Sequence, residues 1–289
     1  MKRIILILSF FILPLSYILA QDEAETQSVP VRAPFESGVL IDNQTVQIPT
    51  KGTLEFLIHH RFGIVDNGIT DLFGIYAPGA NVRLGLNYSL RDNLVVGFGT
   101  TKNKKMQDFQ WKWLIFEQTR DYKFPVSLAY YGNFAIDGRS DDAFGISYKF
   151  ANRFSFFNQL IFSHRINDMI SIQVSPSYTH YNIADSVSDH DKIGVSFSGR
   201  VKISPQSSIM IQADIPLKIK GISEQLEFTN PSKPNFGIGW EISTSTHAFQ
   251  IYAGSAAGIL PQEIMMNNQN NFFDGDFMIG FTITRLWSF

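Results

Sequence analysis

The sequence predicts an all-β protein, a transmembrane antiparallel up-and-down β-barrel of about twelve strands, the even number that bacterial barrels prefer. Three observations lead to this prediction. The chain begins with an export signal, apolar and polar residues alternate along most of the remainder, and the last segment carries aromatic residues on its apolar face. Because successive side chains of a strand point to opposite faces, each such segment presents one apolar and one polar surface.

Residues 1–20 have the features of a secretory signal peptide. Lys2 and Arg3 precede the apolar stretch Ile4–Leu19, and the small residue Ala20 stands before polar residues. This order of basic, apolar and small residues is typical of a signal that is cleaved on export. A membrane-spanning helix is the weaker interpretation, because Pro14 interrupts an apolar stretch that is already short for a span.

Composition narrows the class of protein further. The absence of cysteine excludes a lipid-modified cysteine, disulfides and thiolate metal sites. The net charge of −2 argues against nucleic acid as a partner. No stretch after Ala20 is apolar enough for a helical span, yet 14% of the residues are aromatic and only 17% are charged. Such a composition indicates a surface that faces lipid.

Residues 21–50 show no sustained period and contain Pro30 and Pro34. We interpret them as an irregular N-terminal lead-in or a plug in the lumen. The barrel is expected to occupy residues 51–289. No internal repeat or low-complexity tract divides it, so the sequence predicts one domain.

Regular alternation begins at Thr53. In residues 53–62 the apolar Leu54 and Phe56 alternate with the polar Glu55, and the same pattern recurs at 82–89, 192–203 and 236–242. A soluble sandwich would alternate in the same way. However, segments such as 169–181 and 191–203 exceed the usual five or six residues of a soluble strand and suit about ten residues tilted across a bilayer.

The connections fall into short turns and long polar loops, which alternate in the second half of the chain. Short turns face the periplasm and long loops face the outside in outer-membrane barrels. To keep this alternation, residues 143–150 and 154–165 are interpreted as one strand with an irregular start. This choice gives the even strand number.

The last segment places aromatic and apolar side chains on one face. They are Phe277, Ile279, Phe281, Ile283, Trp287 and Phe289. This arrangement resembles the C-terminal signal that the barrel assembly machinery reads in outer-membrane proteins. Arg285 departs from the pattern, since it falls on the apolar face, and a charge is tolerated there only near the headgroups.

Several short segments carry a resemblance to a known family. They include Phe35–Gly38, Phe56–Gly63, Asp71–Gly74, Asn81–Gly85 and Trp111–Trp113. In these segments the chain resembles an uncharacterised family of Bacteroidota outer-membrane β-barrels. The resemblance implies the fold and a location in the cell outer membrane. It implies no activity and transfers no site.

Alternation assigns a set of charged residues to the polar, inward face. These candidate lumen-lining residues are Glu55, Arg61, Arg83, Lys112, Arg200, Lys202, Asp214 and Glu241. In a water-filled pore their slight excess of positive charge would favour small anions. Alternatively, opposite charges pair across a narrow lumen and close it. A barrel of about twelve strands permits either interpretation by its size.

No motif indicates catalytic, cofactor-binding or metal-binding residues, so we expect no enzyme and no cofactor. His59 and His60 are neighbours on a strand and point to opposite faces, so they cannot chelate one ion together. A membrane phospholipase was considered because His180 lies near a loop on the lipid face, but the serine motif of such enzymes is missing.

Two functions remain open on sequence grounds. The first is a channel or transporter for a small solute. The second is a sealed structural or accessory barrel that binds a partner through its loops or its N-terminal segment. The apolar connection with Leu72, Phe73, Ile75 and Tyr76 either folds inward as a constriction or packs on the rim. Outer-membrane lipid and the assembly machinery are the expected partners.

We therefore predict that the protein fractionates with the outer membrane and migrates faster on electrophoresis before heating than after it. Unpaired backbone cannot face lipid, so the sheet must close, and closed barrels resist unfolding by detergent at room temperature. Recovery in the soluble periplasmic fraction without detergent would contradict this prediction.

Overall fold

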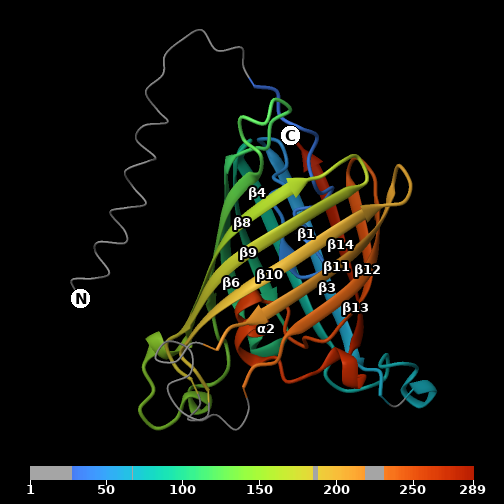
Figure 1. The fold of residues 1–289 in the computed structure, drawn as a ribbon. Helices are drawn as coiled ribbons and strands as arrows, with labels where there is room; N and C mark the ends of the chain where they lie inside the picture. The colour runs from blue at the N-terminus through green and yellow to red at the C-terminus, as the bar shows by residue number, and fades with distance from the viewer. Residues whose placement is uncertain (1–27, 67, 185–187, 219–230) are drawn as a thin grey trace.

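The computed structural model describes residues 28–66, 68–184, 188–218 and 231–289. In this part of the chain twelve antiparallel strands form a closed barrel, and a two-stranded sheet lies inside it (Figure 1). The predicted fold class and strand number are confirmed. The signal predicted for residues 1–20 lies outside the described residues.

The barrel strands follow one another along the chain. They are β3 (Thr53–Ile64), β4 (Asn81–Arg91), β5 (Leu94–Thr101), β6 (Gln107–Phe116), β7 (Ser127–Ile136), β8 (Phe154–Arg165), β9 (Ile170–Tyr181), β10 (Asp191–Lys202), β11 (Ser207–Pro216), β12 (Asn235–Ser243), β13 (His247–Gly254) and β14 (Met278–Ser288). Each strand pairs with the next, and β14 pairs with β3 to close the barrel. No helix in the described residues is long and apolar enough to cross a membrane.

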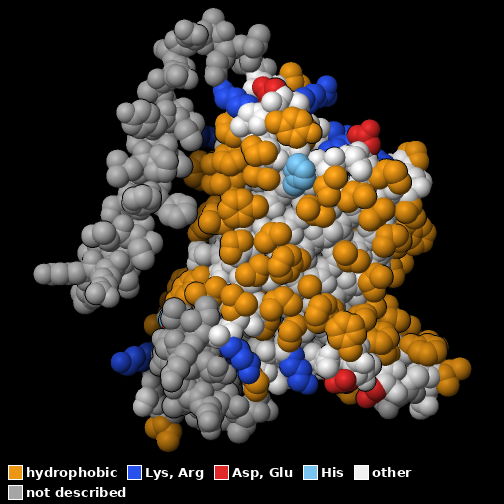
Figure 2. Space-filling model, in the orientation of Figure 1, with side chains coloured by type: hydrophobic (Ala, Val, Ile, Leu, Met, Phe, Trp, Pro, Cys, Tyr) orange, Lys and Arg blue, Asp and Glu red, His pale blue; other side chains and the backbone are white. Residues whose placement is uncertain are grey.

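Alternation sorts the side chains of every strand between the outside and the interior. On β4, Asn81 and Arg83 are buried inside, whereas Leu84 and Leu86 are 43% and 49% exposed on the outside. Apolar side chains cover the outer wall in Figure 2, where a membrane protein meets lipid. This distribution confirms the two faces predicted from the sequence.

Connections of two kinds lie at opposite ends of the barrel. The long loops gather at the lower end in Figure 1, and the short turns lie at the upper end with the C-terminal end of β14. We assign the end with the short turns to the periplasm and the end with the long loops to the outside. Arg285 lies near the periplasmic end, where its guanidinium contacts the His247 ring and stands 5.6 Å from the ring centre of Trp287.

The predicted strand over residues 143–150 is wrong. These residues belong to the β7–β8 loop, which contains two short 3-10 helices, η3 (Asp141–Phe144) and η4 (Phe150–Arg153). The Arg153 guanidinium folds the loop back by donating hydrogen bonds to the carbonyl oxygens of Asp137 (2.7 Å) and Arg139 (2.6 Å). The strand count is unchanged, because β8 begins at Phe154.

Residues 34–48 enter the lumen from the periplasmic end and are mostly buried there. They form a small hairpin of β1 (Val39–Leu40) and β2 (Asn43–Gln44). Outside the lumen, the backbone N–H of Val31 donates to the carbonyl oxygen of Gln118 at 2.9 Å, which ties this segment to the β6–β7 turn. We call residues 28–52 the N-terminal plug.

Helix α2 (Pro261–Asn267), from the β13–β14 loop, enters the lumen from the outer end (Figure 1). Its Met265 packs with Val46 of the plug in one buried apolar cluster that also contains Tyr131, Phe157 and Ile161. The two inserted segments therefore meet inside the barrel, and the lumen is occupied from both ends.

The apolar connection after β3 does not constrict the lumen. Leu72, Phe73, Ile75 and Tyr76 follow the short helix η1 (Gly68–Asp71) and are between 41% and 73% exposed. Leu72 and Phe73 have positive φ values of 47° and 53°, so the loop turns sharply and projects away from the barrel.

A charge on the outer wall should cost stability according to its depth in the bilayer. We predict that Ile211→Lys, in the middle of β11 and 56% exposed, lowers the free energy of unfolding by about 2–4 kcal/mol. The control Ile203→Lys, next to a periplasmic turn, should cost only about 0–1 kcal/mol. Urea unfolding in phospholipid vesicles measures both, and equal effects would contradict the proposed depth of the two side chains.

Candidate functional site

The eight charged residues expected on the inward face all lie on the inner wall. Seven of them are buried, and Lys202 near the periplasmic end is partly exposed. Whether they line the path of a solute stays a prediction. The hydrogen bonds and ion pairs of these residues show which segments of the chain occupy the lumen.

Arg61 on β3 connects three parts of the chain. Its guanidinium pairs with the carboxylate of Asp42 in the plug and donates to the carbonyl oxygens of Ala256 and Gly258 in the β13–β14 loop. Asp42 also accepts a hydrogen bond from the side chain of Gln212 at 2.6 Å. One buried ion pair thus fixes the plug to two sides of the wall.

Glu36 is the second acidic anchor of the plug. Its carboxylate lies 3.0 Å from the Arg200 guanidinium and 3.6 Å from the Lys202 ammonium, both on β10. Burial raises the pKa of Glu36, but the charges of Arg200 and of Arg32, at 3.1 Å, outweigh it, so the pKa lies below its ordinary value. The carboxylate is therefore held in its charged form.

Lys112 on β6 contacts the plug through hydrogen bonds to neutral groups. Its ammonium donates to the carbonyl oxygen of Gly38 at 3.0 Å and to the side-chain oxygen of Gln44 at 3.3 Å. A wall cation here binds the plug through neutral oxygens.

Arg83 differs from the other wall cations because its partner is also on the wall. Its guanidinium binds both carboxylate oxygens of Asp108 on β6, at 2.9 and 2.6 Å. Asn133 donates a further hydrogen bond to Asp108 at 3.1 Å. With Asn133, this buried bidentate pair joins strands β4, β6 and β7.

The three inward acids accept hydrogen bonds from amide side chains. Glu55 accepts from Asn87 (2.6 Å), Asp214 from Asn235 (2.8 Å) and Glu241 from Gln250 (2.8 Å). The acids that pair with the wall cations are instead Glu36, Asp42 and Asp108, which sequence reasoning missed. Asp108 was detectable, because it shares the inward parity of Lys112 on the same strand.

The plug fits closely against the wall. Two interior cavities between them, one bordered by Gln47 and Pro49 and one by Asn43 and Met265, each measure about 10 Å³. Such a volume holds about one water molecule. A larger cavity of about 340 Å³ lies at the outer end, beyond α2.

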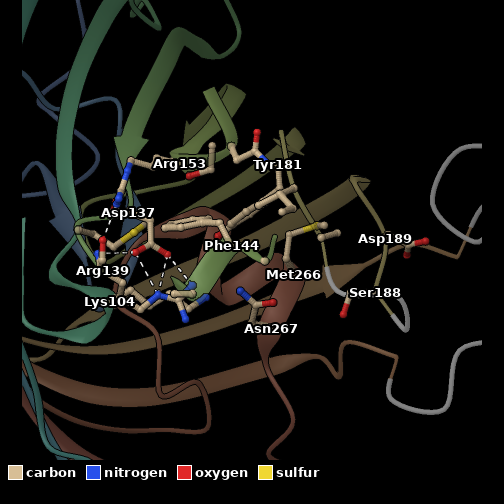
Figure 3. A pocket seen from close by; sticks show the side chains of 17 residues that line it. Lys104, Asp137, Arg139, Phe144, Arg153, Tyr181, Ser188, Asp189, Met266 and Asn267 are labelled. Carbon is tan, nitrogen blue, oxygen red and sulfur yellow. Dashed lines mark hydrogen bonds and ion pairs between the residues drawn. The ribbon is translucent and has the colours of Figure 1, made fainter. Parts of the chain in front are cut away.

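The outer cavity is formed by the long loops and the barrel rim (Figure 3). Its lining includes Lys104 from the β5–β6 loop, Arg139 and Arg153 from the β7–β8 loop, Tyr181 at the end of β9, and Asn267 of α2. Phe144 extends into it, with the guanidinium carbons of Arg139 and Arg153 at 5.6 and 4.7 Å from the ring centre. The cavity therefore combines an aromatic surface with three cationic residues and two acidic ones, Asp137 and Asp189.

His59 and His60 are neighbours on β3 and lie on opposite faces of the wall. His59 points into the lumen, and His60 stacks on Phe281 outside, with ring centres 5.0 Å apart. The ring nitrogens of His180 contact Asp191 and Asn182, at 2.7 and 3.1 Å. No cluster of three or more metal-ligating side chains occurs within the described ranges.

Breaking the wall pair should destabilise the barrel. We predict that Arg83→Met lowers the free energy of unfolding by about 3–5 kcal/mol, because it leaves the Asp108 carboxylate buried without its counterion. The double variant Arg83→Met, Asp108→Leu should recover most of this loss, since apolar replacement of a buried pair is often nearly neutral. Thermal unfolding in detergent tests this, and an equal loss in both variants would contradict it.

Solved structures with a similar fold are outer-membrane proteins. An outer-membrane channel from Pseudomonas putida F1 has a TM-score of 0.51 and 12% identity, and the match covers 83% of this chain and 97% of that chain. The KdgM porin has a TM-score of 0.44 and 7% identity, over 82% and 99%. Omp33 of Acinetobacter baumannii has a TM-score of 0.41 and 8% identity, over 82% and 99%. No curated protein matches the sequence.

A family of membrane-bound beta-barrel domains, DUF5777, matches residues 35–287. The match begins within the plug and ends in the last strand, so it includes both the barrel and the segment that fills it. This match, the closed fold and the apolar outer wall agree on the location of the protein. The chain is an outer-membrane β-barrel and belongs to the DUF5777 family of membrane-bound beta-barrel domains.

Proposed function

We propose that the protein is a gated channel for a small solute, preferably an anion, and that the N-terminal plug is its gate. The observation that carries this proposal is the polar contact between plug and wall. Asp42, Glu36 and the backbone of Gly38 face charged or amide groups of the barrel.

A permanent seal would be more stable with apolar contacts. Buried apolar area stabilises a fold without needing matched partners, whereas a buried ion pair gains little after its desolvation is counted. A polar wall has a different advantage, because water can wet it when the plug leaves. The inner wall of this barrel is rich in serine, threonine, asparagine and glutamine side chains, as an aqueous path requires.

Departure of the plug would also change the charge of the lumen. Glu36 and Asp42 would leave, and Arg61, Arg200 and Lys202 would lose their acidic partners. Arg83 would keep Asp108. Because the released groups are all cations, the emptied lumen should favour anions.

A sealed accessory barrel is the second candidate. Its support is the filling of the lumen from both ends, by the plug and by α2. For this candidate the loops or the plug would bind a partner and nothing would cross. We propose no catalytic activity under either function.

Removing the gate tests the two candidates against each other. We predict that a mature variant lacking residues 28–50 conducts in planar bilayers with a preference for anions, whereas the parent is mostly closed. Arg61→Glu with Arg200→Glu in that variant should reverse the preference, because lumen charges set selectivity.

Because the shortened chain could misfold, a full-length variant tests the same gate independently. Glu36→Gln with Asp42→Asn keeps the plug but removes its two charges, so openings should become more frequent than in the parent. The heat-dependent shift on electrophoresis verifies that each variant is folded. Folded variants of both kinds that show no conductance would exclude the channel and favour the sealed barrel.

A further inference from the structure

The carboxylate of Glu263 fixes α2 at the outer end of the lumen. Its Oε1 atom accepts hydrogen bonds from the Lys104 ammonium (2.9 Å), the Tyr181 hydroxyl (2.8 Å) and the Asn267 amide (3.1 Å). Glu263 is only 6% exposed. Two of these donors come from the barrel, so this one oxygen holds the inserted helix to the wall.

The same three donors line the outer cavity, whereas Glu263 stands behind them. An anion that enters the cavity therefore meets the groups that hold Glu263. A carboxylate of a solute has the same charge and acceptor geometry as the carboxylate of Glu263. The solute carboxylate and the Glu263 carboxylate would compete for the Lys104 ammonium and the Tyr181 hydroxyl.

Lys104 lies in a turn whose backbone conformation is unfavourable for a residue with a side chain. Lys104 and Lys105 have φ values of 51° and 50°, a left-handed region that side chains with a Cβ rarely adopt. The backbone N–H of Gly138 donates to the carbonyl oxygen of Lys104 at 3.0 Å and fixes the turn against the next loop. Such conformations are concentrated at functional sites, where the surroundings maintain them.

Two further cations, Arg139 and Arg153, also line the cavity. Arg139 and Arg153 flank Phe144 there, and Arg139 binds Asp137 through contacts of 2.7 to 3.1 Å (Figure 3). A volume of about 340 Å³ is at the lower end for ligand sites, so it suits a small molecule. A short dicarboxylate could contact Lys104 with one carboxylate and the arginines with the other.

We propose that the outer cavity binds a small dicarboxylate, and that one of its carboxylates replaces Glu263 on Lys104 and Tyr181 and so releases α2. This proposal rests on the proposed channel, for which the cavity is the outer access point. Release of α2 would also remove Met265 from Val46 of the plug. Binding outside would then weaken the inner closure as well.

Binding of succinate to the full mature protein in detergent is the first test, measured by calorimetry. Glu263→Gln should bind succinate about tenfold more tightly, because a neutral amide competes less well for a charged donor than a carboxylate does. Lys104→Met should bind it at least about tenfold more weakly, because the charged donor is lost. Lys105→Met, on the adjacent exposed lysine, is the matched control and should leave the affinity unchanged.

If Glu263 has a purely structural role, Glu263→Gln should bind succinate no more tightly than the parent. That result would overturn the proposed competition between succinate and Glu263. Inorganic phosphate and glucose serve as comparison probes. Phosphate that binds in place of succinate would overturn the carboxylate class, and glucose that binds as tightly would overturn the role of charge.

Release of α2 is tested separately by thiol labelling. Because the natural chain has no cysteine, Met265→Cys introduces a single thiol at a position that is 2% exposed. Saturating succinate should raise its rate of reaction with a maleimide about tenfold, and Lys104→Met in the same background should remove the dependence on succinate. An unchanged rate in the presence of bound succinate would overturn the release of α2.

The experiments distinguish failure of the dicarboxylate site from failure of the proposed channel. If the plug deletion conducts but succinate neither binds nor changes labelling, the channel stands and the dicarboxylate site is wrong. If succinate binds and exposes residue 265 but the folded deletion variant does not conduct, the site stands as a receptor on a sealed barrel.

Discussion

Backbone hydrogen bonding in lipid is the constraint on which this structure depends. Because hydrocarbon cannot satisfy an exposed strand edge, the first barrel strand β3 must pair with the last, β14. Closure then turns one face of every strand into an interior wall. The inward side chains of a twelve-stranded barrel do not fill its lumen, and other parts of this chain enter it. The plug and α2 follow from this geometry.

The interior is organised by ion pairs and by two buried apolar clusters between the plug and the wall. Arg61, Arg200 and Lys202 are balanced by two acids of the plug, and Arg83 is balanced by Asp108 on the wall itself. This division separates two roles. The wall pair lies entirely within the barrel, whereas the plug pairs join the barrel to a segment that supplies the acidic partners.

The two inserted segments close the lumen in a shared way. Each is held by a buried carboxylate, Asp42 for the plug and Glu263 for α2, and they touch through Val46 and Met265. The buried cluster that contains both side chains brings the two inserted segments together in the lumen.

The sequence by itself determined the strands and their faces, because a period of two is a local property that each segment shows alone. The number of strands also required the rule that short turns and long loops alternate around an outer-membrane barrel. The sequence pattern misassigned residues 143–150 to a strand, because so short an alternating stretch occurs in loops as well as in strands. Only the tertiary structure decided which charges meet. Glu36 and Asp42 lie in a segment without periodicity, and their pairing with β10 and β3 depends on where that segment folds once the barrel has closed. Contacts between distant parts of a chain are set by closure and register, which no single segment encodes.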